Sequence, residues 1–281
     1  MSVIFHNRLV SILFSRRSSK AGVVIILAFL ILIVVGPAVI PYGPYQTSNQ
    51  VYAHPSLSHI LGTDYQGTDV LSQLVWGAIP SMIVGILGAL GAVLIGLLVG
   101  SLAGYYTRYE GVLTGFTDIV MIFPPVPLMV LLGTIRPASN TDLIIILAVV
   151  LWPPIARSIR SQVLSIREMP FIEVAKMSGM RDSEILVKLV IRSVAVIAFA
   201  YFVLTVGAAI ILVTGLEYIG VGNPDIVSWG SMIYWAQNFG FYAGAWWWIL
   251  APGVAISLLT IGFALIGFSI EEALNPRLRT T

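Results

Sequence analysis

The sequence predicts an all-α, polytopic membrane protein with six transmembrane helices and both termini in the cytoplasm. Of the 281 residues, 58% are apolar or aromatic and only 10% are charged, whereas about 25% of the residues of soluble domains are charged. Six apolar stretches approach or exceed the length that crosses a bilayer. Lysine and arginine are concentrated between alternate stretches, which is the charge asymmetry of membrane proteins.

The first apolar stretch, 21–40, follows several basic residues and is expected to be a retained membrane span. It contains about 20 apolar residues, whereas the apolar core of a cleavable signal peptide has about 7–15 and ends at a small-residue cleavage site. Prolines follow the stretch instead. The other five stretches lie at 78–105, 112–134, 142–159, 194–214 and 246–270. We therefore divide the chain into 1–77 (tail, first helix and external segment) and 78–281 (a five-helix core with a cytoplasmic loop at 160–193).

The distribution of basic residues orients these spans. With the N-terminus inside, the inner segments are 1–20, 106–111, 160–193 and 271–281. Together with the adjoining helix ends they contain 14 of the 15 Lys and Arg residues, and only Arg136 lies outside. The external segment 41–77 contains neither Lys nor Arg. This bias predicts that both termini are cytoplasmic.

Glycines recur in the second stretch, at Gly85, Gly88, Gly91, Gly96 and Gly100. Small residues allow helices to approach closely in lipid, where packing of large apolar side chains gains little over contact with lipid tails. We expect these glycines to serve ordinary helix packing.

The cytoplasmic loop 160–193 has a helical pattern of its own. Pro170 suits a first helical turn, Glu173 lies near the positive end of the helix dipole, and Gly179 is expected to end the helix. Phe171, Val174, Ala175 and Ser178 share one face. From this pattern alone, an amphipathic helix lying on the membrane surface is an equally good interpretation.

This loop resembles the EAA loop of binding-protein-dependent ABC importer permeases. Glu173, Ala175, Gly179 and Ile185 match the motif, and Val174 stands where the first of its two alanines is usual. The His and Pro often found later in the motif are replaced by Leu189 and Arg192.

The rest of the chain resembles the dipeptide/oligopeptide/nickel branch of that family. Residues 61–71 are similar to its LGTDxxGRDVLSR signature, with Thr68 in place of Arg, and 17–44 resembles its first span and proline-rich exit. Residues 218–230 resemble its FLGLG…SWG segment, and 251–253 and 273–277 resemble its last span and C-terminal tail. The resemblance covers nearly the whole chain and points to the C-type permease subunit of a peptide importer in the cell membrane.

The resemblance implies the type I importer permease fold, membrane lipid as surroundings and several protein partners. These are a second homologous permease, two ATP-binding cassette ATPases that hold ATP and Mg²⁺, and an extracytoplasmic substrate-binding protein. It also implies that 171–180 is a coupling helix that docks in a groove of an ATPase. Its ATPase-contacting residues would be Phe171, Glu173, Val174, Ala175, Ser178 and Gly179, with Glu173 facing a basic residue of the ATPase.

Composition excludes several kinds of chemistry for the chain itself. There is no cysteine, which excludes thiol catalysis and disulfides, and the three histidines His6, His54 and His59 form no metal-binding spacing. No G-x-x-x-x-G-K-[ST] motif occurs, so we expect no ATP hydrolysis, catalytic residue, metal or bound cofactor here. A net charge of +2 gives no indication of nucleic-acid binding.

Two groups of residues are further site candidates. Asp118 is the ionisable residue that we place within a span, and ionisable groups in membranes are functional candidates or structural hydrogen-bonding groups. Pro124 and Pro125 should break the third span, which makes this region a candidate for the pathway or gate. Outside, His59, Asp64 and Asp69 could contact the binding protein or cap a turn before the second span.

The substrate class follows only from the resemblance. Oligopeptides are the first expectation, oligosaccharides the second, and nickel is less favoured because no metal-binding cluster is present. The alternatives are a stand-alone secondary transporter or channel, against which the scarcity of intramembrane acids argues, and a structural subunit of another membrane complex.

Overall fold

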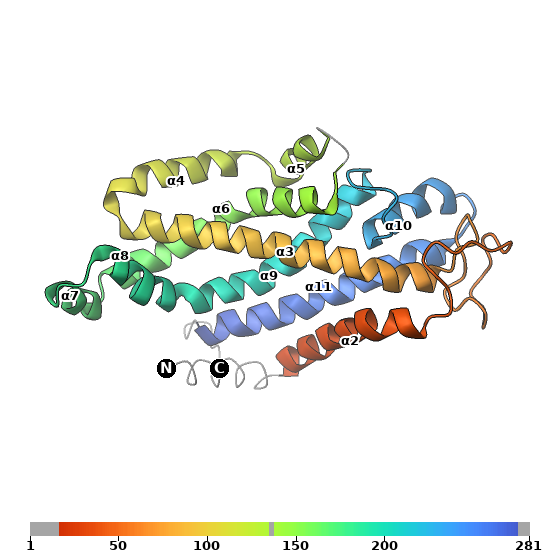
Figure 1. Ribbon diagram of the computed structural model, residues 1–281, viewed down its shortest axis with the longest axis horizontal. Helices are drawn as coiled ribbons and strands as arrows, with labels where there is room; N and C mark the ends of the chain where they lie inside the picture. Colours follow the sequence, from red (N-terminus) through yellow and green to blue (C-terminus); the bar gives the residue numbers. More distant parts are fainter. Residues whose placement is uncertain (1–16, 135–137, 275–281) are drawn as a thin grey trace.

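The computed structural model describes residues 17–134 and 138–274, which are mostly helical, with a long non-helical segment at 40–69. The predicted N-terminal tail with Arg8 and Arg16, the external Arg136 and the C-terminal Arg277 lie outside the described residues. The spanning helices run along the long axis of the molecule (Figure 1). Helix α7 lies at one end, and the segment 40–69 and α10 lie at the other.

Five helices are long and apolar enough to cross a membrane, and a bent pair supplies a sixth span if it is counted as one. Four of them are α2 (Arg17–Val39), α3 (Val70–Tyr105), α6 (Asn140–Arg167) and α11 (Trp246–Leu274). The fifth is one continuous helix that consists of α8 (Asp182–Ile185), η1 (Leu186–Ile191) and α9 (Arg192–Tyr218). Helix η1 is a π-helical segment within this continuous helix. The short helices are α7 (Pro170–Met177), α10 (Trp229–Trp235) and the π-helical η2 (Ala236–Gly240).

The bent pair consists of α4 (Thr107–Ile122) and α5 (Pro125–Gly133), which meet at 83°. Pro124 precedes α5, and Pro125 occupies the first position of α5. Proline donates no backbone hydrogen bond and clashes with the preceding turn of a helix, so α4 cannot continue past this point. The predicted proline break is therefore present, and the stretch 112–134 is two helices with different directions.

Several predicted boundaries differ from the observed ones because the helices extend beyond their most apolar parts. Helix α3 begins at Val70 rather than at 78, since Asp69 caps its first turn. The loop predicted at 160–193 is shorter, because α6 continues to Arg167 and helical structure resumes at Asp182. The connection that contains α7 is therefore 168–181.

Glycines bring α3 close to its neighbours, as the sequence predicts. Helices α3 and α6 make the most extensive contact in the described part of the chain. Gly88 of α3 packs against Leu147, and Gly96 packs against Ile155. At Gly100 an added Cβ would lie 2.5 Å from the backbone oxygen of Ala156. Because that atom belongs to the backbone of α6, it cannot rotate away. The two helices can keep this close separation only if residue 100 has no side chain.

We predict that Gly100→Ala destabilises the protein, whereas Gly111→Ala does not. The first methyl group must push α3 and α6 apart, and overpacking of this kind costs about 1–3 kcal/mol. No heavy atom lies within 4 Å of the equivalent position at Gly111 of α4, and replacing an exposed helical Gly by Ala gains about 0.5–1 kcal/mol. Thermal unfolding of the purified variants in detergent measures both effects. Equal stabilities for the two variants would contradict the account of this contact.

Candidate functional site

Helix α7 forms as the local sequence predicts. Pro170 is its first residue and Glu173 lies in its first turn. The helix ends at Met177, and Gly179, two residues further, has a φ of +78°, in the left-handed region that favours glycine. The backbone N–H of Gly179 donates to Lys176 and that of Met180 donates to Ala175, at 3.0 and 3.2 Å. These two bonds form a Schellman motif, which satisfies the last carbonyl groups of the helix.

The exposed face of α7 differs from the predicted one in one respect. Phe171 and Val174 are exposed, as expected of a docking face, and Met177 is 82% exposed. Ala175, however, is buried with Ile172 against the chain itself. Ala175 therefore does not belong to the exposed face. Ser178 is exposed, and its hydroxyl donates to the carbonyl of Val174 within the same helix.

Both ends of the connection that carries α7 are fastened to the last turn of α3. Arg167, the last residue of α6, donates to the carbonyl of Gly104 at 3.3 Å. On the other side, the hydroxyl of Tyr105 donates to Asp182, the first residue of α8, at 2.9 Å. Since α6 and α8 both bind the same turn, α7 is held at a fixed place beyond the ends of the long helices (Figure 1).

Asp118 is paired with a residue of another helix. Nη2 of Arg157 in α6 donates to Oδ1 of Asp118 at 2.6 Å, and both side chains are about half exposed. A second ion pair, between Glu110 of α4 and Arg160 of α6, lies beside it and is less exposed. Thr117 is the only buried residue of α4. Phe116 of α4 stacks on Trp152 of α6 with ring centroids 5.9 Å apart, so this ring contact and the two ion pairs together join α4 to α6.

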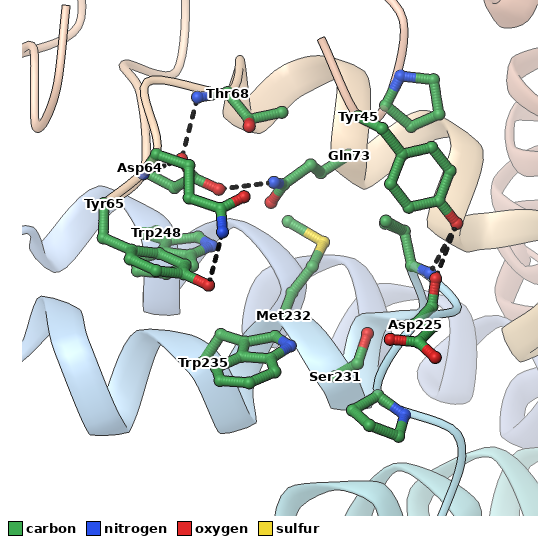
Figure 2. A pocket seen from close by; sticks show the side chains of 14 residues that line it. Tyr45, Asp64, Tyr65, Thr68, Gln73, Asp225, Ser231, Met232, Trp235 and Trp248 are labelled. Carbon is green, nitrogen blue, oxygen red and sulfur yellow. Dashed lines mark hydrogen bonds between the residues drawn. The ribbon is translucent and has the colours of Figure 1, made fainter. Parts of the chain in front are cut away.

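Asp64, in the segment 40–69, is a buried acid that organises the local backbone. Its side chain is almost inaccessible, and its Oδ1 accepts the backbone N–H groups of Gln66 and Thr68, both at 2.8 Å. Its Oδ2 accepts the side-chain amide of Gln73 in α3 at 2.6 Å (Figure 2). Burial raises the pKa of Asp64 above its ordinary value, although these hydrogen bonds lower it in part.

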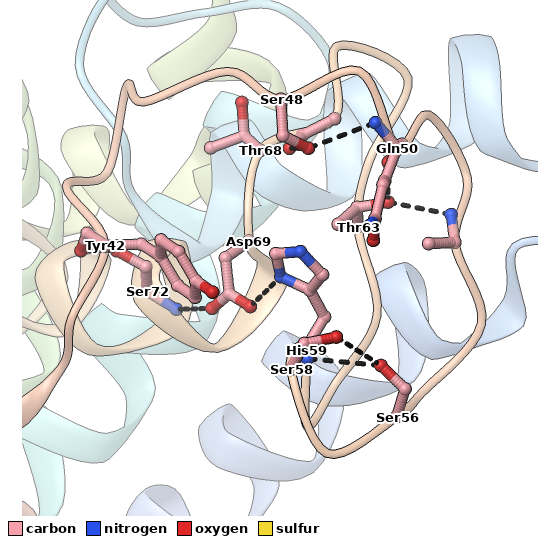
Figure 3. Close-up of polar contacts among 12 residues, drawn as sticks. Tyr42, Ser48, Gln50, Ser56, Ser58, His59, Thr63, Thr68, Asp69 and Ser72 are labelled. Carbon is pink, nitrogen blue, oxygen red and sulfur yellow. Dashed lines mark hydrogen bonds and ion pairs between the residues drawn. The ribbon is translucent and has the colours of Figure 1, made fainter.

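Asp69 and His59 form a second buried group in the same segment (Figure 3). Asp69 caps α3 by accepting the backbone N–H of Ser72 at 2.8 Å, and its other oxygen lies 2.9 Å from Nδ1 of His59. The His59 ring also stacks on Tyr42. All three side chains, His59, Asp64 and Asp69, are buried, and they make hydrogen bonds within this segment and to the start of α3.

Glu217 is a polar residue that sequence reasoning missed. It lies in the last turn of α9, beyond Thr214, where the predicted span ended. The hydroxyl of Ser228 donates to Oε2 of Glu217 at 2.8 Å, and the backbone N–H of Gly230 also bonds to this carboxylate. Glu217 thus fastens the start of α10 to α9. Among the described residues, no group of three or more His, Cys, Asp or Glu side chains could hold a metal ion.

The chain is similar to known membrane transport proteins over nearly its whole length. The sequence model of the family described as "Binding-protein-dependent transport system inner membrane component" matches residues 92–280. The dipeptide transport system permease protein DppC of Alkalihalophilus pseudofirmus is 31% identical over 263 residues, which cover 92% of this chain and 86% of the relative. DppC of Bacillus subtilis is 30% identical, with coverage of 94% and 83%. The glutathione transport system permease protein GsiD of Pectobacterium atrosepticum is 26% identical, with coverage of 95% and 91%.

We predict that Asp64→Ala destabilises the external segment. The substitution leaves two backbone N–H groups and the amide of Gln73 without their acceptor, and an unsatisfied buried donor costs about 1–3 kcal/mol. The matched control is Asp225→Ala, because Asp225 is an exposed external acid and surface substitutions usually change stability by about 0.5 kcal/mol or less. Thermal unfolding and protease cleavage within 40–69 provide the measurement. Wild-type stability of Asp64→Ala would show that the segment does not depend on this carboxylate.

Proposed function

Because the chain belongs to the family of binding-protein-dependent transport system inner membrane components, we propose that it is a permease subunit of an ATP-driven importer and forms half of the translocation path for oligopeptides. It is a multi-pass protein of the cell membrane. The observation that carries the substrate class is the similarity, over more than 90% of the chain, to permeases named for dipeptide and glutathione transport. The family membership favours this function over a stand-alone secondary transporter or channel.

The importer needs partners that this chain does not contain. The family's description implies an external substrate-binding protein. The sequence has no P-loop motif that would cradle nucleotide phosphates, so ATP and Mg²⁺ belong to two ATPase subunits. A second homologous permease completes the path. Both termini and α7 lie on the cytoplasmic side, because nearly all Lys and Arg residues adjoin that side.

Helix α7 is the coupling helix in this proposal. It lies beyond the ends of the spanning helices and exposes Phe171, Val174 and Met177. An apolar face of this kind outside the bilayer is typical of a protein interface. The proposed partner is a groove of an ATPase, with Glu173 in the first turn of α7 directed at a basic residue there. Because Ala175 anchors α7 to its own chain, a movement of the ATPase would be transmitted to α6 and α8 as a unit.

The ion pair between Asp118 and Arg157 marks the face of α4 and α6 that we assign to the path or to the second permease. Charged residues in spans almost always face a bundle interior or a water-filled cavity, because contact with lipid is costly. The two side chains are half exposed in the isolated subunit, so other protein or water covers them in the importer. The break at Pro124 and Pro125 lies about two helical turns further along the same span.

We predict that Val174→Asp abolishes peptide uptake without removing the subunit from the membrane. The side chain is 61% exposed, so the new charge is tolerated by the subunit and opposes only the docking of an apolar partner. Glu173→Lys should act in the same way by reversing the charge. Val174→Ile is the matched control and should retain uptake. Uptake of a labelled peptide is measured together with the amount of the subunit in the membrane. Normal uptake by both charged variants would show that α7 does not dock on the ATPase.

We predict that the two single variants Asp118→Arg and Arg157→Asp reduce uptake by about tenfold or more, and that the double variant recovers much of it. Each single change places two like charges together within a span, which is costly, whereas the exchange restores an opposite pair. Lys188→Gln is the control, because Lys188 forms an exposed pair with Glu184 of a kind that contributes little. Full uptake by both single variants would contradict a role for the ion pair.

A further inference from the structure

The bend between α4 and α5 is exposed at every residue from 121 to 127, a segment that we call the elbow. Ile122 is 76% exposed, Phe123 55% and Val126 49%. Phe123 lies about 22 Å of helix rise beyond Arg108, the basic residue at the start of α4. The hydrocarbon core of a bilayer is about 30 Å thick, so the elbow lies inside it. The function described above assigns no ligand to the elbow.

Prolines leave two backbone carbonyl groups of the elbow without partners. In an α-helix, the carbonyl of each residue accepts the N–H of the residue four positions further on. For Met121 and Phe123 these residues are Pro125 and Pro127, which have no N–H. Within residues 17–134 and 138–274, neither carbonyl accepts a hydrogen bond from another part of the backbone. The carbonyl of Met121 points beyond the end of α4, because helix carbonyls point towards the C-terminus and α5 turns away by 83°.

Neither lipid nor an apolar helix of another subunit satisfies such carbonyl groups. Lipid tails contain no hydrogen-bond donor, and an unpaired backbone group in hydrocarbon is costly. A membrane-spanning helix already uses its backbone N–H groups in its own hydrogen bonds. Irregular backbone at this depth is tolerated where protein buries it or where it lines a water-filled cavity. Because this chain leaves the elbow exposed, water is the surrounding that fits the carbonyl groups.

The ion pair between Asp118 and Arg157 indicates the same surroundings independently. Asp118 lies three residues before Met121 and four before Ile122, so these three residues share one side of α4. Both charged side chains are about half exposed. Charged residues in spans almost always face a bundle interior or a water-filled cavity. One side of α4 therefore carries both a charged pair and the unpaired carbonyl of Met121.

The elbow offers groups that suit a peptide backbone. Peptides of any sequence carry backbone N–H groups, which are the donors that carbonyl oxygens accept. The side chains around the two carbonyl groups are apolar and uncharged, those of Met121, Ile122, Phe123 and Val126. They carry no charge that would select one kind of peptide side chain, and methionine adapts to partners of different shape. The elbow therefore combines acceptors for the constant part of a peptide with tolerant surroundings for its variable part.

We propose that the elbow lines a water-filled part of the translocation path and contacts the transported peptide there. The carbonyl groups of Met121 and Phe123 accept hydrogen bonds from backbone N–H groups of the peptide. This assignment rests on the function proposed above and names a contact of its substrate.

The reactivity of single cysteines tests this proposal, since the chain has no cysteine of its own. The importer, purified with its partner subunits in lipid nanodiscs, is treated with a charged methanethiosulfonate reagent that reacts in water. Val126→Cys and Ile122→Cys should each react at least about tenfold faster than Leu90→Cys. Leu90 is the matched control, because it is 40% exposed and lies in the continuous helix α3 at a similar distance from the connection to α4.

Added peptide then tests the hydrogen bonds. Trialanine should slow the reaction of Val126→Cys, and trialanine methylated at its backbone nitrogens should need at least about a tenfold higher concentration for the same effect. No binding protein is present in this assay, so its own preference for either peptide does not enter the comparison.

Three outcomes would overturn the proposal. Reaction of both elbow cysteines as slow as that of Leu90→Cys would place the elbow against lipid or inside a protein interface. Reaction that trialanine does not slow would show a water-filled space without peptide contact. Equal protection by the two peptides would show contact without the proposed hydrogen bonds. Failure of the chain to purify with ATPase subunits would instead contradict the importer function, so the two proposals fail separately.

Discussion

The packing of α3 against α6 is the contact on which the rest of the structure depends. Glycines on α3 allow backbone-to-backbone approach, and at Gly100 the nearest atom is a carbonyl oxygen of α6. In lipid there is little hydrophobic gain from bringing helices together, so close packing of this kind supplies the attraction. It makes α3 and α6 one rigid unit that reaches from the segment 40–69 to α7 (Figure 1).

The two ends of that unit hold the segments that extend beyond the spanning helices. At the end proposed to be cytoplasmic, the last turn of α3 binds both Arg167 and Asp182, so α7 cannot move without α6 and α8. At the other end, Asp69 caps α3, and Gln73 of α3 binds Asp64. Within the broken span, α5 packs into the core through the buried Met129, whereas α4 is attached through ion pairs, a ring contact and little buried surface. Helix α4 is therefore the element best suited to rearrange while the rigid unit moves as a whole.

The sequence predicted the features that arise from local chemistry. Apolar length located the spans, the prolines located the break at Pro124, and Gly179 located the end of α7, because only glycine adopts its positive φ at little cost. Features that depend on tertiary contacts could not be predicted in this way. The pattern of α7 grouped Ala175 with the exposed Val174, since helical spacing cannot tell which side meets its own chain. Glu217 was missed because the apolar stretch ended before the helix did, and its partner Ser228 follows in a separate segment.

The proposed docking of α7 on an ATPase in the cytoplasm is tested most directly by site-specific cross-linking. The chain has no cysteine, so a single cysteine placed at Val174 or at the fully exposed external Leu57 reports on one position. Cross-linked partners from native membranes are identified by mass spectrometry. We expect Val174→Cys, but not Leu57→Cys, to capture a subunit with a P-loop motif. Capture of no such subunit at position 174, or equal capture at both positions, would contradict the account.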